Sequence, residues 1–174
     1  MNLKEILRGR LSKSDITGLA SQMRDDSAKE DLYRLTLDED NRVARQAMWM
    51  LRTLGEEDNK WLLRKCDELT DRVMVESDTA KRRLMLGLLS LLPIDEGNVR
   101  ADFLDFCLAN ITACSQPYAV RAQCIKLAYG QCRFFPELLD ELKATLDMLA
   151  QEQLSPGLMS AKRQVMRKLK WLQK

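Results

Sequence analysis

The chain has 174 residues, of which 45% are hydrophobic and 31% charged, and it contains seven glycines, four prolines and a formal net charge of +2. This length suits one domain with its own buried core, and so few glycines and prolines leave no room for a long flexible linker. Because the chain has no histidine, its composition excludes histidine-based triads, histidine metal sites and the commonest general base at neutral pH.

The first 26 residues are expected to form a helical cap. Residues 2–10 and 14–25 each suit a short helix, and the second carries an apolar stripe of Ile16, Leu19 and Met23. Neither helix fits the repeat described below, and an array of repeats needs an end that does not associate. Charged residues occupy the N-terminus where a signal peptide would need an apolar core, so we expect a cytoplasmic protein.

One apolar pattern then occurs four times. In each copy, apolar residues stand at i, i+4 and i+8, which places them on one side of a helix, and a basic residue follows the first within two positions. The copies are Val43, Ala47 and Leu51; Ala80, Leu84 and Leu88; Val120, Cys124 and Ala128; and Ala161, Val165 and Leu169. Their first residues are 37, 40 and 41 positions apart, a period typical of repeats with two helices each.

The helices that carry these stripes, which we name B helices, each need a partner because a single apolar stripe is not stable in water. An amphipathic segment, the A helix, precedes each of them. The A helices are expected at residues 27–38, 57–75, 97–115 and 136–152, and the B helices at 41–54, 78–92, 117–133 and 156–174. The expected repeats are 27–54, 56–92, 95–133 and 136–174, in a single domain that covers residues 1–174.

This pattern resembles the HEAT family of armadillo-like α-solenoids, whose second helix tends to read Asp, two residues, Val-Arg, two residues, Ala, three residues, Leu. In the first copy the matching residues are Asp40, Val43, Ala47 and Leu51. The resemblance implies an all-α fold, an α-α superhelix of about four helical hairpins with the second helices on the concave side. The alternative is an ordinary helical bundle with accidental spacing, but four stripes with a basic residue at the same phase favour the repeat.

Charge is sorted between the two kinds of helix. The predicted B segments sum to +14, although the chain as a whole carries only +2. The A segments, counted with their flanking turns over residues 27–40, 56–76, 95–115 and 136–152, sum to −13. If the B helices share one side, that side is basic and the opposite side acidic. Four cations also stand near B-helix starts, where the helix dipole disfavours them, so a neighbouring Asp or an anionic ligand is expected to hold them. They are Arg42, Lys81, Arg121 and Lys162.

Positions two, six and nine after the first residue of each stripe point away from it and form the predicted binding surface. The surface residues are Arg45, Trp49, Arg52, Arg82, Leu86, Leu89, Lys126, Tyr129, Arg163, Arg167 and Lys170. Basic side chains interleaved with aromatic and leucine side chains are typical of a surface that binds a partner. The alternative is that Trp49, Leu86 and Leu89 pack within a tight stack or an oligomer interface.

The cysteines do not predict a metal site. There are five, none separated from another by two residues, which is typical of reduced thiols that pack as small apolar groups. Cys107 and Cys114 are seven residues apart on one predicted helix, about 10.5 Å of rise, which is too far for both to ligate one zinc ion.

No catalytic motif is present either. The pairs Asp67 with Asp71 and Asp102 with Asp105 share helix sides, but they lie on acidic A helices and are expected to be solvated surface. Some HEAT-like solenoids are DNA glycosylases with a catalytic Asp among tryptophans. Because the predicted binding surface contains no acid, no catalytic residue follows from that resemblance.

The sequence therefore predicts a non-catalytic binding or scaffold module that holds an acidic protein or peptide on its basic B-helix side, with no cofactor and no metal. The longest apolar run, Leu84–Leu92, is far below a membrane span, so no membrane partner is expected. The alternative is binding of DNA or RNA by the same side, including a DNA-alkylation-repair-like HEAT protein. A third hypothesis is an enzyme whose site uses Asp, Glu, Cys or Tyr.

Overall fold

A computed structural model describes residues 2–149 and 153–172. Over these residues the chain forms eleven α-helices and one short 3₁₀ helix, with no strand, so the predicted all-α class is confirmed. The chain divides into two compact units, one of residues 1–71 and 80–92 and the other of residues 72–79 and 93–174. The assignment of one domain to the whole chain stays a prediction.

The chain opens with two short helices, as the cap prediction expected: α1 (Leu3–Arg8) and α2 (Lys13–Ala20). The second begins one residue earlier than predicted, because Ser12 caps it, and it ends at Ala20, five residues before the predicted end. The Ser12 hydroxyl accepts a bond from the Asp15 amide, and the Asp15 carboxylate accepts one from the Ser12 amide at 2.8 Å. The bond from the Ser12 backbone is the main reason why the pKa of Asp15 is lowered.

The first predicted repeat consists of α3 (Asp26–Leu35) and α4 (Asn41–Arg52). Asp40 caps α4 by accepting a bond from the Arg42 amide at 2.9 Å. Helix α4 is the centre of the first unit, where it packs against α1, α2 and α3. The predicted stripe of this helix is confirmed, because Val43, Ala47 and Leu51 are buried.

The A helix predicted at residues 57–75 is wrong as one element, because two helices occupy it: α5 (Glu56–Leu63) and α6 (Cys66–Val75). The backbone ends α5 with short bonds, from the Arg64 amide to Trp61 and from the Lys65 amide to Leu62, each three residues back. Side chains at the break reach α3. Arg64 pairs with Asp26 at 2.6 Å and Lys65 with Glu30 at 2.9 Å.

Aromatic packing holds the same break. The Trp61 ring meets the Tyr33 ring edge-on, with 6.1 Å between centroids, and the Lys65 ammonium lies 5.0 Å from the centre of the Tyr33 ring. These contacts join residues far apart in sequence, so local helix propensity did not reveal the break.

Helix α7 (Thr79–Leu89) follows. Six successive residues in it, 84–89, are buried, so the helix is covered on more than one side. In its predicted stripe Leu84 and Leu88 are buried and Ala80 is half-buried.

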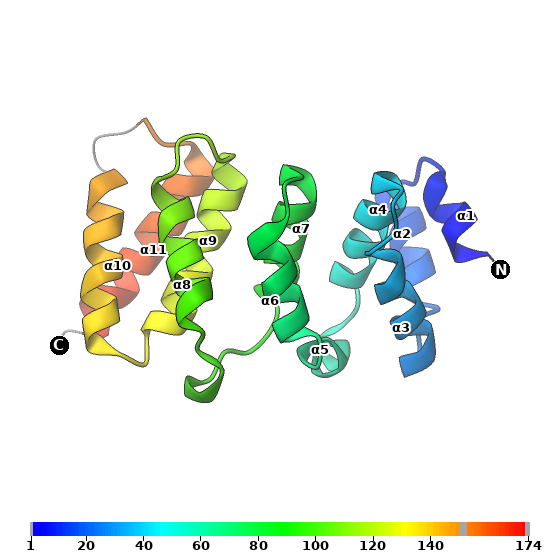
Figure 1. Ribbon diagram of the computed structural model, residues 1–174, viewed down its shortest axis with the longest axis horizontal. Helices are drawn as coiled ribbons and strands as arrows, with labels where there is room; N and C mark the ends of the chain where they lie inside the picture. The colour runs from blue at the N-terminus through cyan, green and yellow to red at the C-terminus, as the bar shows by residue number, and fades with distance from the viewer. Residues whose placement is uncertain (1, 150–152, 173–174) are drawn as a thin grey trace. The chain divides into compact units, whose positions relative to one another are not determined.

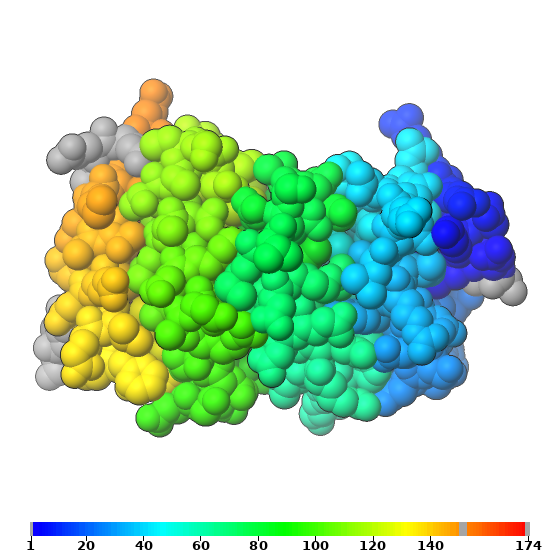
Figure 2. All heavy atoms as spheres, viewed as in Figure 1, coloured from blue at the N-terminus to red at the C-terminus, as the bar shows by residue number. Residues whose placement is uncertain are grey.

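The second unit contains α8 (Ala101–Thr112), α9 (Tyr118–Cys132), α10 (Pro136–Met148) and α11 (Pro156–Leu172). Helix α9 packs against the other three, and Figure 1 shows α8 and α10 side by side in front of α9 and α11. In the space-filling view of this side, the side chains of α8 and α10 form most of the visible surface of the unit (Figure 2). Two layers result, one of A helices and one of B helices.

Helix starts in this unit partly follow the predictions. The A helix expected from residue 97 begins at Ala101, because residues Glu96–Asn98 form a 3₁₀ turn instead. Pro136 occupies the first turn of α10, and the Ser155 hydroxyl accepts a bond from the Leu158 amide before α11. Residues 150–152 and 173–174 of the fourth predicted repeat lie outside the described residues.

Candidate functional site

Burial separates the eleven predicted surface residues into three groups. The exposed ones are Lys126, Arg163, Arg167 and Lys170. The half-buried ones are Arg45, Trp49, Arg52, Arg82 and Tyr129. Leu86 and Leu89 are 0% and 3% exposed, so their predicted place on the surface is wrong. They belong to the buried run of α7, and packing within the stack is the interpretation that the structure favours for them.

In the first unit, the guanidinium of Arg52 packs against α7 at Gly87. Trp49 is half-buried on the same helix, as is Arg45. These α4 side chains therefore spend much of their surface on contacts within the protein. They offer a partner less area than their phase in the sequence suggested.

In the second unit, α9 and α11 meet at a cation–aromatic contact that the sequence phase missed. The Lys168 ammonium lies 5.0 Å from the centre of the Tyr129 ring. Lys168 stands seven residues after Ala161, a position that the pattern assigned to neither the stripe nor the surface. A signal was present, since seven residues are two helical turns and bring Lys168 close to the apolar stripe, where the neighbouring B helix packs.

Helix α11 carries five cations and no acid between Pro156 and Leu172. Of these, Arg163, Arg167 and Lys170 are exposed. Within residues 2–149 and 153–172, none of these three has an ion pair. The arrangement therefore presents positive charge that the described part of the chain does not neutralise.

The cations near B-helix starts were expected to need a neighbouring Asp or an anion, but for two of them the acceptor is a backbone carbonyl. Arg121 is 2% exposed, and its Nε donates to the Ile111 oxygen at 2.8 Å. Arg42 donates to the Arg8 oxygen at 3.3 Å. Both acceptors lie in the last turn of a preceding helix, where carbonyls lack helical partners and the dipole favours a cation. These residues are therefore structural.

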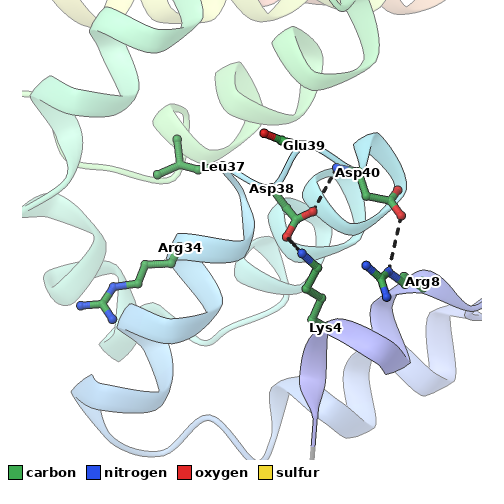
Figure 3. Close-up of a pocket in the computed structure, with 7 residues that line it drawn as sticks. All are labelled: Lys4, Arg8, Arg34, Leu37, Asp38, Glu39 and Asp40. Atoms are coloured by element: carbon green, nitrogen blue, oxygen red, sulfur yellow. Dashed lines mark hydrogen bonds and ion pairs between the residues drawn. The ribbon is translucent and has the colours of Figure 1, made fainter.

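An open depression of about 490 Å³ lies in the first unit, between α1 and the turn that joins α3 to α4 (Figure 3). Lys4 pairs with Asp38 at 2.6 Å, and Arg8 lies 3.8 Å from Asp40. The bond from Lys4 is the main reason why the pKa of Asp38 lies below its usual value, with a second contribution from the Asp40 amide. The two ion pairs attach α1 to the turn between α3 and α4. Because the cations and carboxylates neutralise each other, the depression presents no group that is activated for catalysis.

The buried cysteines are chemically quiet. Burial raises the pKa of the Cys107 thiol, with Cys124 adding to the effect, and it raises the pKa of Cys132 to about 12. A raised pKa keeps these thiols protonated, and a protonated thiol is a poor nucleophile and a poor metal ligand. No group of three or more metal-ligating side chains occurs in the part of the chain that the structure describes. Among those same residues, no helix is long and apolar enough to cross a membrane.

Comparison with known proteins adds one finding. The family model described as HEAT repeat domain matches residues 3–169, nearly the whole chain and including the two cap helices. No curated protein matches the sequence significantly.

Proposed function

Because the chain belongs to the HEAT repeat family of α-solenoid proteins, whose repeats generally mediate protein–protein interactions, we propose that it is a non-catalytic module that binds an acidic segment of a partner protein. The observation that carries the proposal is the charge on α11, whose exposed residues Arg163, Arg167 and Lys170 have no ion pair among the described residues. Unneutralised cations on one helix attract carboxylates and speed their encounter.

Helix α9, which packs against α11, carries the other two predicted surface residues of the second unit. Lys126 is exposed, and Tyr129 is half-buried beside Lys168. A tyrosine that is partly covered and held by a neighbour offers contact area at a low entropy cost. The half-buried residues of the first unit, Arg45, Trp49, Arg52 and Arg82, have a smaller role in this proposal.

Binding of a fluorescent poly-glutamate peptide, followed by anisotropy at low salt, tests the proposal. The variant that combines Arg163→Glu, Arg167→Glu and Lys170→Glu is expected to bind at least about tenfold more weakly, because attraction becomes repulsion at three sites. The matched control combines Arg10→Glu, Lys13→Glu and Arg24→Glu. It replaces three exposed residues of the first unit and changes the net charge of the protein by the same amount. Equal affinity in the two variants would remove the proposal.

Nucleic acid is the second candidate, and one observation favours it. Trp171 is 73% exposed and stands next to Lys170, and cations beside an exposed aromatic ring suit single-stranded bases. A labelled oligodeoxythymidine in the same titration separates the two candidates. Tighter binding of the oligonucleotide than of poly-glutamate, with a steep loss of affinity as salt rises, would favour nucleic acid.

A further inference from the structure

Helix α11 has a second stripe besides the buried one. Met159, Arg163, Met166 and Lys170 stand at i, i+4, i+7 and i+11, so they fall on one side of the helix. We name these four residues the outer stripe. Met159 is 42% exposed, Arg163 and Lys170 are exposed, and Met166 is half-buried. One side of α11 thus combines thioether side chains with exposed cations, a composition that suits a partner with both apolar and acidic groups.

The position of the outer stripe follows from the Lys168 contact. Lys168 turns toward Tyr129 of α9, and Lys170, two residues later, points about 160° away around the helix at 100° per residue. Residues Ala161, Val165 and Leu169, which face the core, are buried. The outer stripe therefore lies on the side of α11 opposite α9, and the described residues of the unit leave most of it exposed.

The spacing of the outer stripe indicates the shape of its occupant. Steps of four, three and four residues are those by which two helices interlock along their length. Apolar and basic side chains alternate over about 16 Å, or three turns. A partner helix with apolar residues seven positions apart and acids between them would contact both methionines and pair with Arg163 and Lys170.

We infer that the outer stripe binds an acidic amphipathic helix of a partner protein, which packs along α11. The inference rests on the function proposed above and makes it more specific, because it states the conformation and the side-chain pattern of the bound segment. The methionines favour a helix over an extended acidic chain, whose charges would use the cations and leave Met159 uncovered. They also favour it over nucleic acid, whose phosphates gain nothing from a thioether.

Two synthetic peptides of about 20 residues serve as probes, a length at which a helix can form on the protein. The first places leucines seven positions apart and a glutamate four residues after each, so that they share one side. The second has the same composition with leucines and glutamates scattered around the helix. Anisotropy of the labelled peptides gives both affinities. We expect the first to bind at least about fivefold more tightly than the second.

Met159→Lys separates packing from attraction. This variant adds a cation, so a purely electrostatic surface would bind both peptides more tightly, whereas a surface that packs a helix loses its methionine contact and binds the first peptide more weakly. Ser160→Lys is the matched control. It adds the same charge at the next exposed position, about 100° around the helix and off the outer stripe. We expect a threefold or greater loss for the first peptide with Met159→Lys and none with Ser160→Lys.

The outcomes separate the inference from the function on which it rests. Equal binding of the two peptides, tightened by both lysine variants, would overturn the helical inference and leave acidic binding in place. Failure of both peptides to bind would overturn both. Tighter binding of oligodeoxythymidine than of either peptide would replace both with nucleic acid. Self-association in sedimentation that Arg163→Glu with Lys170→Glu abolishes would make a second copy the occupant and overturn the inference.

Discussion

The guanidinium group of Arg52 on α4 occupies the space that a side chain on Gly87 of α7 would need. A Cβ atom built on Gly87 would stand 2.8 Å from Cζ and 2.9 Å from Nε of Arg52. Glycine inside a helix is destabilising relative to alanine, and here its missing side chain leaves room for the arginine against the next B helix. The arginine assigned to partner binding from its phase therefore takes part in packing between two repeats.

This contact predicts a coupling between the two residues. Gly87→Ala forces Arg52 to move, so the gain in helix propensity, about 0.5–1 kcal/mol, is cancelled or reversed. In an Arg52→Ala background that obstacle is absent, and Gly87→Ala should raise the free energy of unfolding. Urea unfolding of the four proteins measures the coupling.

Gly18 is the matched control, since it lies inside α2 and a Cβ there meets nothing within 4 Å. Gly18→Ala should stabilise the protein by about 0.5–1 kcal/mol whether residue 52 is arginine or alanine. If Gly87→Ala stabilises equally in both backgrounds, the two residues do not compete for space.

Arg121 supports the end of α8 from inside the second unit. Arg121→Met removes the bond to the Ile111 oxygen and leaves that buried acceptor without this partner, which should lower the free energy of unfolding by about 1–3 kcal/mol. Arg121→Lys should recover only part of the loss, because lysine has no donor at the Nε position. Arg42→Met, at an exposed and longer version of the contact, should cost less than about 1 kcal/mol. Equal losses for Arg121→Met and Arg42→Met would contradict this account.

The pair of Lys4 and Asp38 predicts a dependence of stability on pH. The folded protein lowers the pKa of Asp38 below its ordinary value of 3.8, mainly through the bond from Lys4. Stabilisation from a lowered carboxyl pKa is present above the ordinary value and is lost as the pH falls through the lowered one. The wild type should therefore exceed Lys4→Met in unfolding free energy near neutral pH, and the difference should shrink below about pH 4.

Carboxyl chemical shifts followed by NMR check the same point directly, since the pKa of Asp38 should rise in Lys4→Met. Lys13→Met, which removes another exposed lysine of the first unit, serves as the control and should leave that pKa unchanged. A difference between wild type and Lys4→Met that grows on acidification would contradict the prediction.

The thiols should react in the order of their exposure. Cys114 is exposed and Cys66 half-buried, whereas Cys107, Cys124 and Cys132 are all 0% exposed. The thiolate is the reactive form, and burial raises the pKa of Cys107 and Cys132. A thiol reagent should therefore label Cys114 quickly, Cys66 slowly and the three buried cysteines only after unfolding. Mass spectrometry of the labelled protein counts them. Rapid labelling of Cys107 in the folded protein would show that α8 and α9 open readily.

Residues 157 to 172 show what the sequence by itself determined. The stripe of Ala161, Val165 and Leu169 was predicted to be buried and is buried, because a period of 3.6 residues leaves a helix only one way to hide three apolar side chains. The same periodicity predicted all four B helices and the repeat spacing. The absence of any acid in α11 was likewise plain from composition.

Only the tertiary structure decided which side chains opposite an apolar stripe are exposed and which contact a neighbouring helix. A helical wheel drawn from one apolar stripe treats every side chain opposite the stripe as surface, but such a side chain can also contact a neighbouring helix. Leu86 and Leu89 are therefore buried, Arg52 lies on Gly87, and Lys168 contacts Tyr129. The division of residues 56–75 into α5 and α6 depends on contacts with α3, more than 30 residues away, which no local pattern reports.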